Sequence, residues 1–425
     1  MFREQKVILK GKKILLGVTG SIAAYKACDV AREFIKAGAS VRVVMSEAAK
    51  RFVTPLTFEA LTREGVLHEG TESWANELNH IDITQWADVF VIAPASANTI
   101  NKLAKGIADN LLLQCALAFD KPILIAPAAN TKMIENHQTK NSIKMLEVSD
   151  MIVIKSQSKL LACGDEGNGA LAEPKEIYWQ TLKTLLKDDF WSDRRVVVTS
   201  GGTIEKIDDV RFISNFSSGK MGHAVATALY LLGADVCLIT TKQTKNIPNE
   251  IYTIDVEDAK EMQGYLTDAI RVAKKGVMSK PSINNPDSIG MIQKEPYLFM
   301  VAAVADYKAK YPQVGKMKKD TTTKELAIEF ELNDDILGSL DKQGIKTIGF
   351  KAEMDAKAGL KNAKEALKVK GVDAICYNLL EDSNSFGSDE NAITFITKES
   401  EINLEKKEKL FLAFDILCEA KKLGD

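Results

Sequence analysis

The 425-residue sequence lacks the cysteine patterns of zinc and disulfide proteins. Its six cysteines lie far apart, and no two of them form a CxxC pair. The spacing therefore predicts neither a metal site nor a disulfide framework. Any cysteine with a special role would act as a single reduced thiol.

Long apolar runs and an excess of positive charge are also missing. No stretch approaches the ~20 apolar residues that a membrane span requires, and the first residues carry no apolar signal-peptide core. We therefore expect a cytoplasmic protein. The formal net charge of −2 disfavours a nucleic-acid binder, because phosphate contacts require a basic excess.

Short apolar runs alternate with helical periodicity along the whole chain, which is typical of parallel βαβ units in a doubly wound α/β fold. The helix predictions include residues 20–38 and, as the clearest, residues 99–119. The expected strands cover residues 13–18, 41–45, 88–94, 122–127 and 151–154, and then 195–200, 235–240, 297–306, 346–353 and 373–379.

A polar stretch, KDDFWSDRR (187–195), interrupts this alternation, and RVVVTSGG then restarts it. At this length two or three domains are expected. We predict two, covering residues 1–190 and 191–425. Residues 276–296 are rich in turn-forming residues and are predicted to be an irregular surface excursion.

Glycine turns follow the first strand of each half, where an open α/β sheet binds its ligands. The first turn, GVTGSIAAYK (17–26), is not GxGxxG and is by itself equally typical of an ordinary strand-to-helix turn. The second ends in SSGK, but Ser214 stands where a Walker A loop requires glycine, so a P-loop is excluded. A nicotinamide dehydrogenase would explain these turns but not the features that follow.

Three further segments place small and hydroxyl residues near strand ends. VMSEAA (44–49) contains Ser46, residues 93–112 begin APASANT, and the glycine-rich segment LACGDEGNGALAEP (161–174) carries Cys163. A loop of the last kind can fold over a ligand and deliver a thiol, although a surface loop with an uninvolved cysteine is the more usual explanation.

Taken together, these motifs resemble two known families. GVTGSIAAYK, NHIDITQWAD, the segment from APASANT to IADNLL, PAANTKM and LACGDEGNG are similar to the flavin-dependent cysteine decarboxylases. RFISNFSSGKMG, AAVADY followed by KMKK, and GFKAEM are similar to the phosphopantothenate–cysteine ligases. In this order they resemble the bacterial bifunctional coenzyme A biosynthesis family, which implies a flavodoxin-like first domain and a Rossmann-like second domain.

For the first domain the resemblance implies FMN-dependent decarboxylation, in which the flavin takes up and returns two electrons. It implies that His80 shuttles a proton, that Asn130 holds the substrate carboxylate and that Cys163 protonates an intermediate. Ala129 and Ala170 depart from the family pattern of methionine and arginine. The implied flavin contacts are Gly20, Ser21, Ile22, Ser46, Pro94, Ser96, Asn98 and Thr99.

For the second domain the resemblance implies activation of 4'-phosphopantothenate by CTP and capture of the acyl-cytidylate by cysteine, with Mg²⁺ accompanying the triphosphate. Asn215 would contact the acyl-cytidylate and Lys316 the triphosphate. Lys364 and Lys368, one turn apart on a helix, would reach the phosphates together. The remaining implied nucleotide contacts are Met300, Val301, Ala302, Asp306, Asp334, Asp335, Ile336, Leu337 and Phe350.

Two alternatives stay open. Ala129 and Ala170 would fit an active ligase beside an impaired decarboxylase, and a flavin-binding regulatory scaffold would need no catalytic residues at all. The KMKK run and the two helix lysines are, taken singly, more typical of solvated surface charge. By resemblance we expect a homo-oligomer that combines decarboxylase trimers with ligase dimers, with flavin at a subunit interface.

Overall fold

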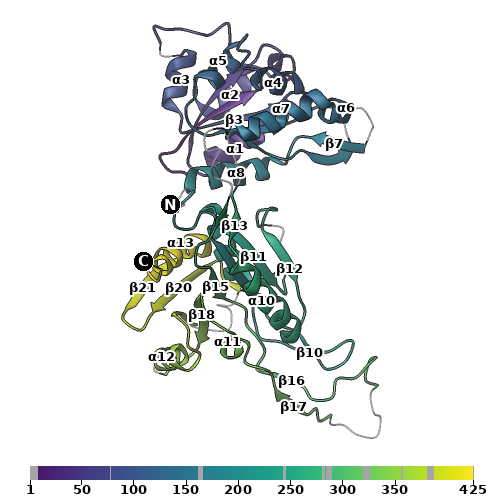
Figure 1. Ribbon diagram of the computed structural model, residues 1–425, viewed down its shortest axis with the longest axis vertical. Helices are drawn as coiled ribbons and strands as arrows, with labels where there is room; N and C mark the ends of the chain where they lie inside the picture. The colour runs from purple at the N-terminus through teal and green to yellow at the C-terminus, as the bar shows by residue number, and fades with distance from the viewer. Residues whose placement is uncertain are drawn as a thin grey trace. The chain divides into compact units, whose positions relative to one another are not determined.

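The computed structural model describes residues 8–76, 78–160, 166–242, 246–279, 283, 290–318, 326–355, 358–380 and 387–424. Its contacts divide the chain into two compact units. The first is Met1–Leu186 with Ser279–Ile289, and the second is Lys187–Met278 with Gly290–Asp425. Each unit is an α/β structure built on one main sheet (Figure 1). No helix in the described residues is long and apolar enough to cross a bilayer.

The first unit is built on a five-stranded parallel sheet with the order β2-β1-β3-β4-β5. This is the flavodoxin-like order, in which the strand order reverses between β1 and β3 while all strands stay parallel. The strands are β1 (Lys13–Val18), β2 (Ser40–Met45), β3 (Val89–Ala95), β4 (Ile123–Pro127) and β5 (Ile152–Val153), and a hairpin of β6 (Gln157–Leu160) and β7 (Glu166–Ala170) lies outside the sheet. The predicted strands of this half are confirmed, because their apolar residues form the buried interior.

Helices follow the strands as the βαβ prediction requires. Among them α1 packs against α2 and α8, α3 packs against α5, and α4 packs against α7. They are α1 (Lys26–Lys36), α2 (Pro55–Thr62), α3 (His80–Trp86), α4 (Ala97–Leu103), α5 (Leu111–Ala118), α6 (Thr131–Glu135), α7 (His137–Val148) and α8 (Pro174–Leu186), with short 3₁₀ turns η1 (Ile22–Tyr25) and η2 (Ala49–Arg51).

The prediction of one long helix over residues 99–119 is wrong. The structure breaks it into α4 and α5, because Gly106 adopts a left-handed conformation with φ +66 that other residues rarely adopt. Asn110 then caps the second helix by accepting a hydrogen bond from the N–H of Leu113 at 3.0 Å. Apolar periodicity alone did not reveal the break.

The second unit contains an eight-stranded sheet with the order β12-β11-β8-β15-β18-β19-β20-β21. Its first six strands follow the Rossmann order, which reverses between β8 and β15. β20 and β21 extend the sheet in antiparallel fashion. The strands are β8 (Arg195–Ser200), β11 (Asp235–Thr240), β12 (Tyr252–Asp255), β15 (Tyr297–Met300), β18 (Lys346–Glu353), β19 (Ala374–Leu379), β20 (Glu390–Ile396) and β21 (Glu401–Glu408).

Four helices of this unit accompany the sheet in the described residues: α9 (Lys220–Leu231), α10 (Ala259–Ala273), α12 (Gly359–Val369) and α13 (Lys409–Lys421), together with the single turn α11 (Ile336–Ser339). Three small antiparallel ribbons lie apart from the sheet. They pair β9 (Glu205–Lys206) with β10 (Phe212–Ile213), β13 (Val277–Met278) with β14 (Met291–Ile292), and β16 (Tyr307–Ala309) with β17 (Phe330–Leu332). The last ribbon projects away from the main sheet (Figure 1).

The predicted excursion over residues 276–296 begins and ends in the β13–β14 ribbon. Most of its middle, residues 280–282 and 284–289, lies outside the described residues. Within it, the N–H of Ile283 donates to the carbonyl of Val148 over 2.9 Å, so this point of the excursion lies on the first unit.

The polar stretch at 187–195 is bound tightly to the second unit. The Lys294 ammonium donates to the carbonyls of Asp189 and Ser192 at 2.5 and 2.7 Å. Trp191 is 1% exposed and its ring meets that of Tyr297 edge-on, with centroids 5.0 Å apart. This segment therefore belongs to the core of the second unit, despite its polar composition.

Candidate active sites

A cleft of about 910 Å³ opens in the first unit at the carboxyl ends of β1, β3 and β4. This is the switch point between β1 and β3, where an open α/β sheet binds its ligand. Of the residues implied as flavin contacts, the cleft is lined by Gly20, Ser21, Ile22, Ser46, Ser96, Asn98 and Thr99, and Asn130, Ala129 and Ala170 line it as well.

The turn after β1 is shaped by close packing. A Cβ atom on Gly20 would lie 2.5 Å from the Cβ of Ala48, so only glycine fits there. Ser21 follows and caps η1, accepting a hydrogen bond from the N–H of Ala23 at 3.3 Å. The glycine thus brings the backbone against the neighbouring loop, and the serine places a hydroxyl at the cleft.

Thr19, which the sequence did not single out, joins this turn to the end of β3. Its hydroxyl donates to the carbonyl of Pro94 at 2.7 Å and accepts from the N–H of Ser96 at 2.9 Å. Pro94 is fully within β3 and is not among the lining residues of the cleft. Its described contact is therefore to the protein, through Thr19.

Ser96 and Thr99 form the start of α4. The Ser96 hydroxyl accepts from the N–H of Thr99 at 3.3 Å and lies 3.0 Å from the Thr99 hydroxyl. Asn98 is exposed on the same turn. The arrangement presents two hydroxyls and one amide along the wall of the cleft.

Ser46 gives the most direct sign that a polar ligand belongs here. Its hydroxyl oxygen is buried, yet it has no hydrogen-bond partner among the described residues. A buried hydroxyl without a partner costs free energy, and Ser46 lines the cleft. The site therefore fits a group with polar atoms, such as the phosphate or the isoalloxazine of a flavin mononucleotide.

The β6–β7 hairpin supports Asn130 from behind. The N–H of Ala129 donates to the carbonyl of Gly169 at 3.1 Å, and Cβ atoms on Gly167 or Gly169 would collide with Thr131 and Ala129. Asn130 in turn caps α6 by accepting from the N–H of Lys132 at 2.9 Å. The glycines of the predicted loop thus serve close packing, while Cys163 lies outside the described residues.

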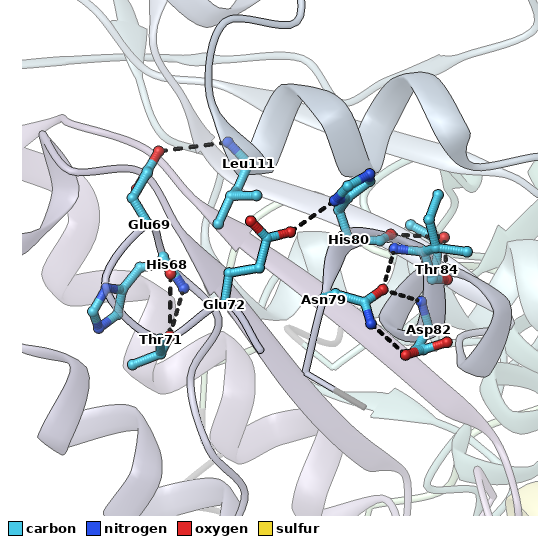
Figure 2. Close-up of polar contacts among 10 residues, drawn as sticks. His68, Glu69, Thr71, Glu72, Asn79, His80, Asp82, Thr84 and Leu111 are labelled. Carbon is cyan, nitrogen blue, oxygen red and sulfur yellow. Dashed lines mark hydrogen bonds and ion pairs between the residues drawn. The ribbon is translucent and has the colours of Figure 1, made fainter. Parts of the chain in front are cut away.

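His80 is the first residue of α3 and does not line the cleft of its own chain. Its Nδ1 lies 2.8 Å from Oε1 of Glu72 (Figure 2). The indole of Trp74 lies edge-on to the imidazole, with ring centroids 5.7 Å apart. The structure therefore does not bring His80 together with Asn130 within one chain.

A second cleft, of about 960 Å³, lies in the second unit at the carboxyl ends of β8, β15, β18 and β19. It includes the switch point between β8 and β15. Of the residues implied for the nucleotide and the acyl-cytidylate, its lining contains Asn215, Met300, Val301, Ala302, Asp306, Asp334, Asp335, Ile336, Leu337 and Phe350.

The segment that begins α9 forms one wall of this cleft. Gly219 caps the helix with φ +72, and its carbonyl accepts from the Ser200 hydroxyl at 2.9 Å. A Cβ on Gly222 would lie 2.5 Å from the Ser200 hydroxyl oxygen. Although it is not a P-loop, SSGKMG brings the start of a 12-residue helix to the cleft, an arrangement that favours bound anions.

Thr199, another residue missed in the sequence, fixes the wall opposite. Its hydroxyl oxygen accepts from the N–H groups of Val301 and Ala302, both at 3.1 Å. Asn215 is exposed and donates from its amide to the carbonyl of Val304 at 2.9 Å. The backbone after β15 is thereby held next to Asn215.

The lysines at this cleft are not the ones that the sequence indicated. Lys364 and Lys368 are exposed and do not line it, and the Lys364 ammonium pairs with Glu401 at 2.6 Å. Lys316 is exposed beyond β16 and is also absent from the lining. The lysines that do line the cleft are Lys220, Lys351, Lys370 and Lys409.

Lys370, just after α12, pairs with Asp335 at 3.0 Å. Burial opposes ionisation of Asp335, but the Gly338 N–H and the Lys370 ammonium outweigh it and lower the pKa of this carboxyl. The contact of Lys364 and Lys368 with the phosphates stays a prediction, and Lys370, just past the same helix, is a further lysine that lines the cleft.

Asn378, at the end of β19, also lines the second cleft, and its buried Oδ1 has no partner among the described residues. A polar residue at the carboxyl end of the apolar run DAICYNL was the signal in the sequence. Within the described residues no three acidic, histidine or cysteine side chains are grouped as a metal site.

Comparison with known proteins agrees with both sites. Residues 3–186 match the model of the Flavoprotein family, and residues 191–280 and 289–423 match the DNA/pantothenate metabolism flavoprotein C-terminal domain. Across nearly its whole length the chain is similar to coenzyme A biosynthesis bifunctional proteins CoaBC. It belongs to this family.

Three members illustrate the extent of the match. The CoaBC protein of Haemophilus influenzae is 37% identical over 422 residues, which cover 97% of each chain. That of Bacillus subtilis is 35% identical over 425 residues, 98% of each chain. That of Escherichia coli is 32% identical over 413 residues, 95% of each chain. The CoaBC family thus accounts for both clefts in one polypeptide.

Proposed function

We propose that this chain carries out two consecutive steps of coenzyme A synthesis. The second unit ligates cysteine to 4'-phosphopantothenate with CTP, and the first unit decarboxylates the product to 4'-phosphopantetheine with FMN. The observation that carries the proposal is a cleft at the topological switch point of each sheet, in a chain that matches CoaBC proteins from end to end. A cytoplasmic setting follows, because CTP and reduced cysteine are supplied there.

In the ligase cleft the chain positions reactants and neutralises charge. The turn before α9 and Lys370 would hold the triphosphate with its Mg²⁺, and the fixed backbone at Val301 and Ala302 would hold the nucleoside. Asn215 lies beside that backbone and is assigned to the acyl-cytidylate. Lys316 would contact the triphosphate only when its segment approaches the cleft.

In the decarboxylase cleft, Ser46, Ser96 and the turn at Gly20 and Ser21 would hold FMN. The flavin supplies a reversible two-electron sink, without which the carboxylate of the cysteine product could not leave. The chain's own residues bind and orient the substrate: Asn130 holds the carboxylate through its amide. His80 and Cys163 are assigned the proton transfers.

We also propose that the active decarboxylase is an assembly of several copies. His80 does not line the cleft of its own chain, so a flavin at a subunit interface would allow one copy to supply His80 and another Asn130. The same reasoning extends to ligase dimers. Here the exposed side chains of the projecting β16–β17 ribbon, including Tyr307, Phe330 and Leu332, offer an apolar contact surface.

The test is mass spectrometry of the purified full chain incubated with 4'-phosphopantothenate, cysteine and Mg–CTP, with its visible spectrum recorded. Formation of 4'-phosphopantetheine together with a flavin spectrum is the expected result. Accumulation of 4'-phosphopantothenoylcysteine would contradict the decarboxylase assignment and point to Ala129 and Ala170. Absence of any product despite a flavin spectrum would favour the scaffold instead.

A further inference from the structure

We propose that Glu72 is a positioning residue that fixes the tautomer of His80. This inference rests on the proposed role of His80 in decarboxylation. The carboxylate of Glu72 would hold the Nδ1 proton of the imidazole, so that Nε2 presents its lone pair to the substrate. Glu72 itself would touch neither substrate nor flavin.

The contact is short and partly shielded. Glu72 Oε1 lies 2.8 Å from His80 Nδ1, and the two side chains are 28% and 24% exposed. An ionised carboxylate can only accept hydrogen bonds, so the proposed tautomer makes Nδ1 the donor. Figure 2 shows the Glu72 side chain directed at the imidazole from the preceding loop.

The backbone brings these two residues together across a closed loop. The N–H of Ser73 donates to the carbonyl of Leu78 at 2.8 Å, and the N–H of Leu78 donates back to Ser73 at 3.1 Å. Glu72 precedes this closure and His80 follows it by two residues. Two reciprocal hydrogen bonds thus place side chains eight residues apart in the sequence at contact distance.

The loop on the Glu72 side is held in turn by Thr71. Its hydroxyl donates to the carbonyl of Val66 at 2.7 Å and accepts from the N–H of His68 at 3.0 Å. The N–H of Glu72 donates to the carbonyl of His68 at 3.2 Å. Leu67, within this segment, pairs with β2 through its backbone at 2.9 Å, which connects Glu72 to the rigid sheet.

The His80 side is fixed at the start of α3. The Asn79 side chain caps the helix by accepting from the N–H groups of Ile81 and Asp82, both at 3.0 Å, and its amide donates to the Asp82 carboxylate. Asp82 is therefore engaged with Asn79. Glu69 is directed elsewhere, toward the N–H of Leu111 at 3.5 Å, which leaves Glu72 as the carboxylate at the imidazole among the described residues.

The proposed proton transfer requires that Nδ1 carries the proton and that Nε2 is unprotonated. A neutral imidazole with its proton on Nδ1 can accept a proton only at Nε2. When the substrate thiol gives up its proton, the S–H bond breaks, its electron pair stays on sulfur and an Nε2–H bond forms. The resulting imidazolium keeps its Nδ1–H on the Glu72 carboxylate, which stabilises the positive charge. A carboxylate that orients a histidine in this way also fixes its tautomer in serine proteases.

The chain contains four histidines, so the ring-nitrogen signals to be assigned are few. The tautomer of His80 can therefore be observed directly. We would record long-range ¹H–¹⁵N spectra of the full chain labelled with ¹⁵N-histidine and assign the His80 signals by their loss in His80→Asn. In the wild type, Nδ1 should show the shift of a protonated nitrogen and Nε2 that of an unprotonated one. In Glu72→Ala the Nε2-protonated tautomer should gain population.

Kinetics on the same preparations supply the second readout. We expect Glu72→Ala to lower kcat of decarboxylation about tenfold or more, with KM within about twofold, and Glu72→Asp to restore part of the loss. Ligase activity and bound flavin in each sample report on folding. The matched control is Glu64→Gln, which removes a carboxylate that pairs with Arg42 at 3.5 Å on the surface.

A lowered kcat together with a changed His80 tautomer supports the inference. An unchanged tautomer, or an unchanged kcat, in Glu72→Ala overturns it even where His80→Asn abolishes decarboxylation. If His80→Asn itself decarboxylates at the wild-type rate, the proposed role of His80 falls first and the role of Glu72 falls with it. The two failures are therefore told apart by one additional variant.

Discussion

The N–H of Ala129 donates a hydrogen bond to the carbonyl of Gly169 over 3.1 Å, and a Cβ on Gly169 would lie 2.1 Å from the carbonyl oxygen of Ala129. This contact joins β7 to the residue before Asn130. The orientation of the proposed carboxylate-binding amide thus depends on a glycine 39 positions later in the chain.

Gly169→Ala should therefore displace the 129–131 segment. We expect a loss of about 1–3 kcal/mol from the stability of the first unit and reduced decarboxylation with unchanged ligation, measured by thermal unfolding and by product formation. The control is Gly264→Ala in α10, where a Cβ meets open space and should stabilise by about 1 kcal/mol. Full decarboxylase activity in Gly169→Ala would contradict the proposed dependence.

Ser46→Ala removes a buried hydroxyl that has no protein partner among the described residues. Stability without flavin should not fall and should rise by up to about 1–3 kcal/mol, because an unpaired buried hydroxyl is removed, while the Kd for FMN should rise about threefold to tenfold, because one hydrogen bond to the ligand is lost. Fluorescence titration of flavin-free protein measures this. Ser149→Ala, whose hydroxyl bonds Met145 at the end of α7, serves as the control, and equal Kd values for the two variants would exclude Ser46 from the flavin site.

Lys370→Met and Lys364→Met form a matched pair on and beside one helix. Lys370 lines the nucleotide cleft, whereas Lys364 pairs with Glu401 on the surface. We expect Lys370→Met to raise KM for CTP about tenfold, the scale of one charge-assisted hydrogen bond. Lys364→Met should change it less than about twofold. Initial-rate assays of ligation decide, and the opposite order would favour the assignment of Lys364 made from the sequence.

His223 gives a prediction for the pH dependence of stability. Burial lowers the pKa of its imidazole, partly offset by a backbone contact with Lys242. In the unfolded chain the imidazole of His223 takes up a proton as the pH falls below its ordinary pKa of 6.5, whereas burial disfavours this protonation in the folded unit. The free energy of unfolding is therefore highest above pH 6.5 and decreases as the pH drops through that value. His223→Gln should unfold with a weaker dependence between pH 7.5 and 5.5, whereas the exposed His137→Gln should resemble the wild type. Identical pH profiles for His223→Gln and the wild type would refute the prediction.

Strand positions could be predicted because buried parallel strands are uniformly apolar and end in recognisable turns. β1 and β8, with the glycines that follow them, were evident in the sequence, and the clefts lie at their ends. The break between α4 and α5 was missed, because Gly106 lies within an otherwise continuous apolar pattern.

Side-chain partnerships were harder to predict, because they depend on how the chain closes in space. Nothing in the sequence around Glu72 indicates that the Ser73–Leu78 closure brings it to His80. Lys370 lies two residues from Lys368, a shift of about 200° around a helix, and helical spacing alone did not reveal which of them lines the second cleft. The buried atoms on Ser46 and Asn378 that lack partners in the described part of the chain become visible only once their surroundings are packed.

The attachment of residues 187–195 determines where this enzyme could be cut into two proteins. Besides the Lys294 contacts, Arg194 donates to the carbonyl of Phe190 at 3.0 Å and its guanidinium lies 3.8 Å from the centre of the Phe190 ring. A ligase fragment that begins at Lys187 retains these contacts of Lys294 and Arg194. One that begins at Trp191 removes the Phe190 ring and carbonyl from Arg194. Truncation, gene splitting and fusion of the ligase to other enzymes should therefore respect the boundary between Leu186 and Lys187.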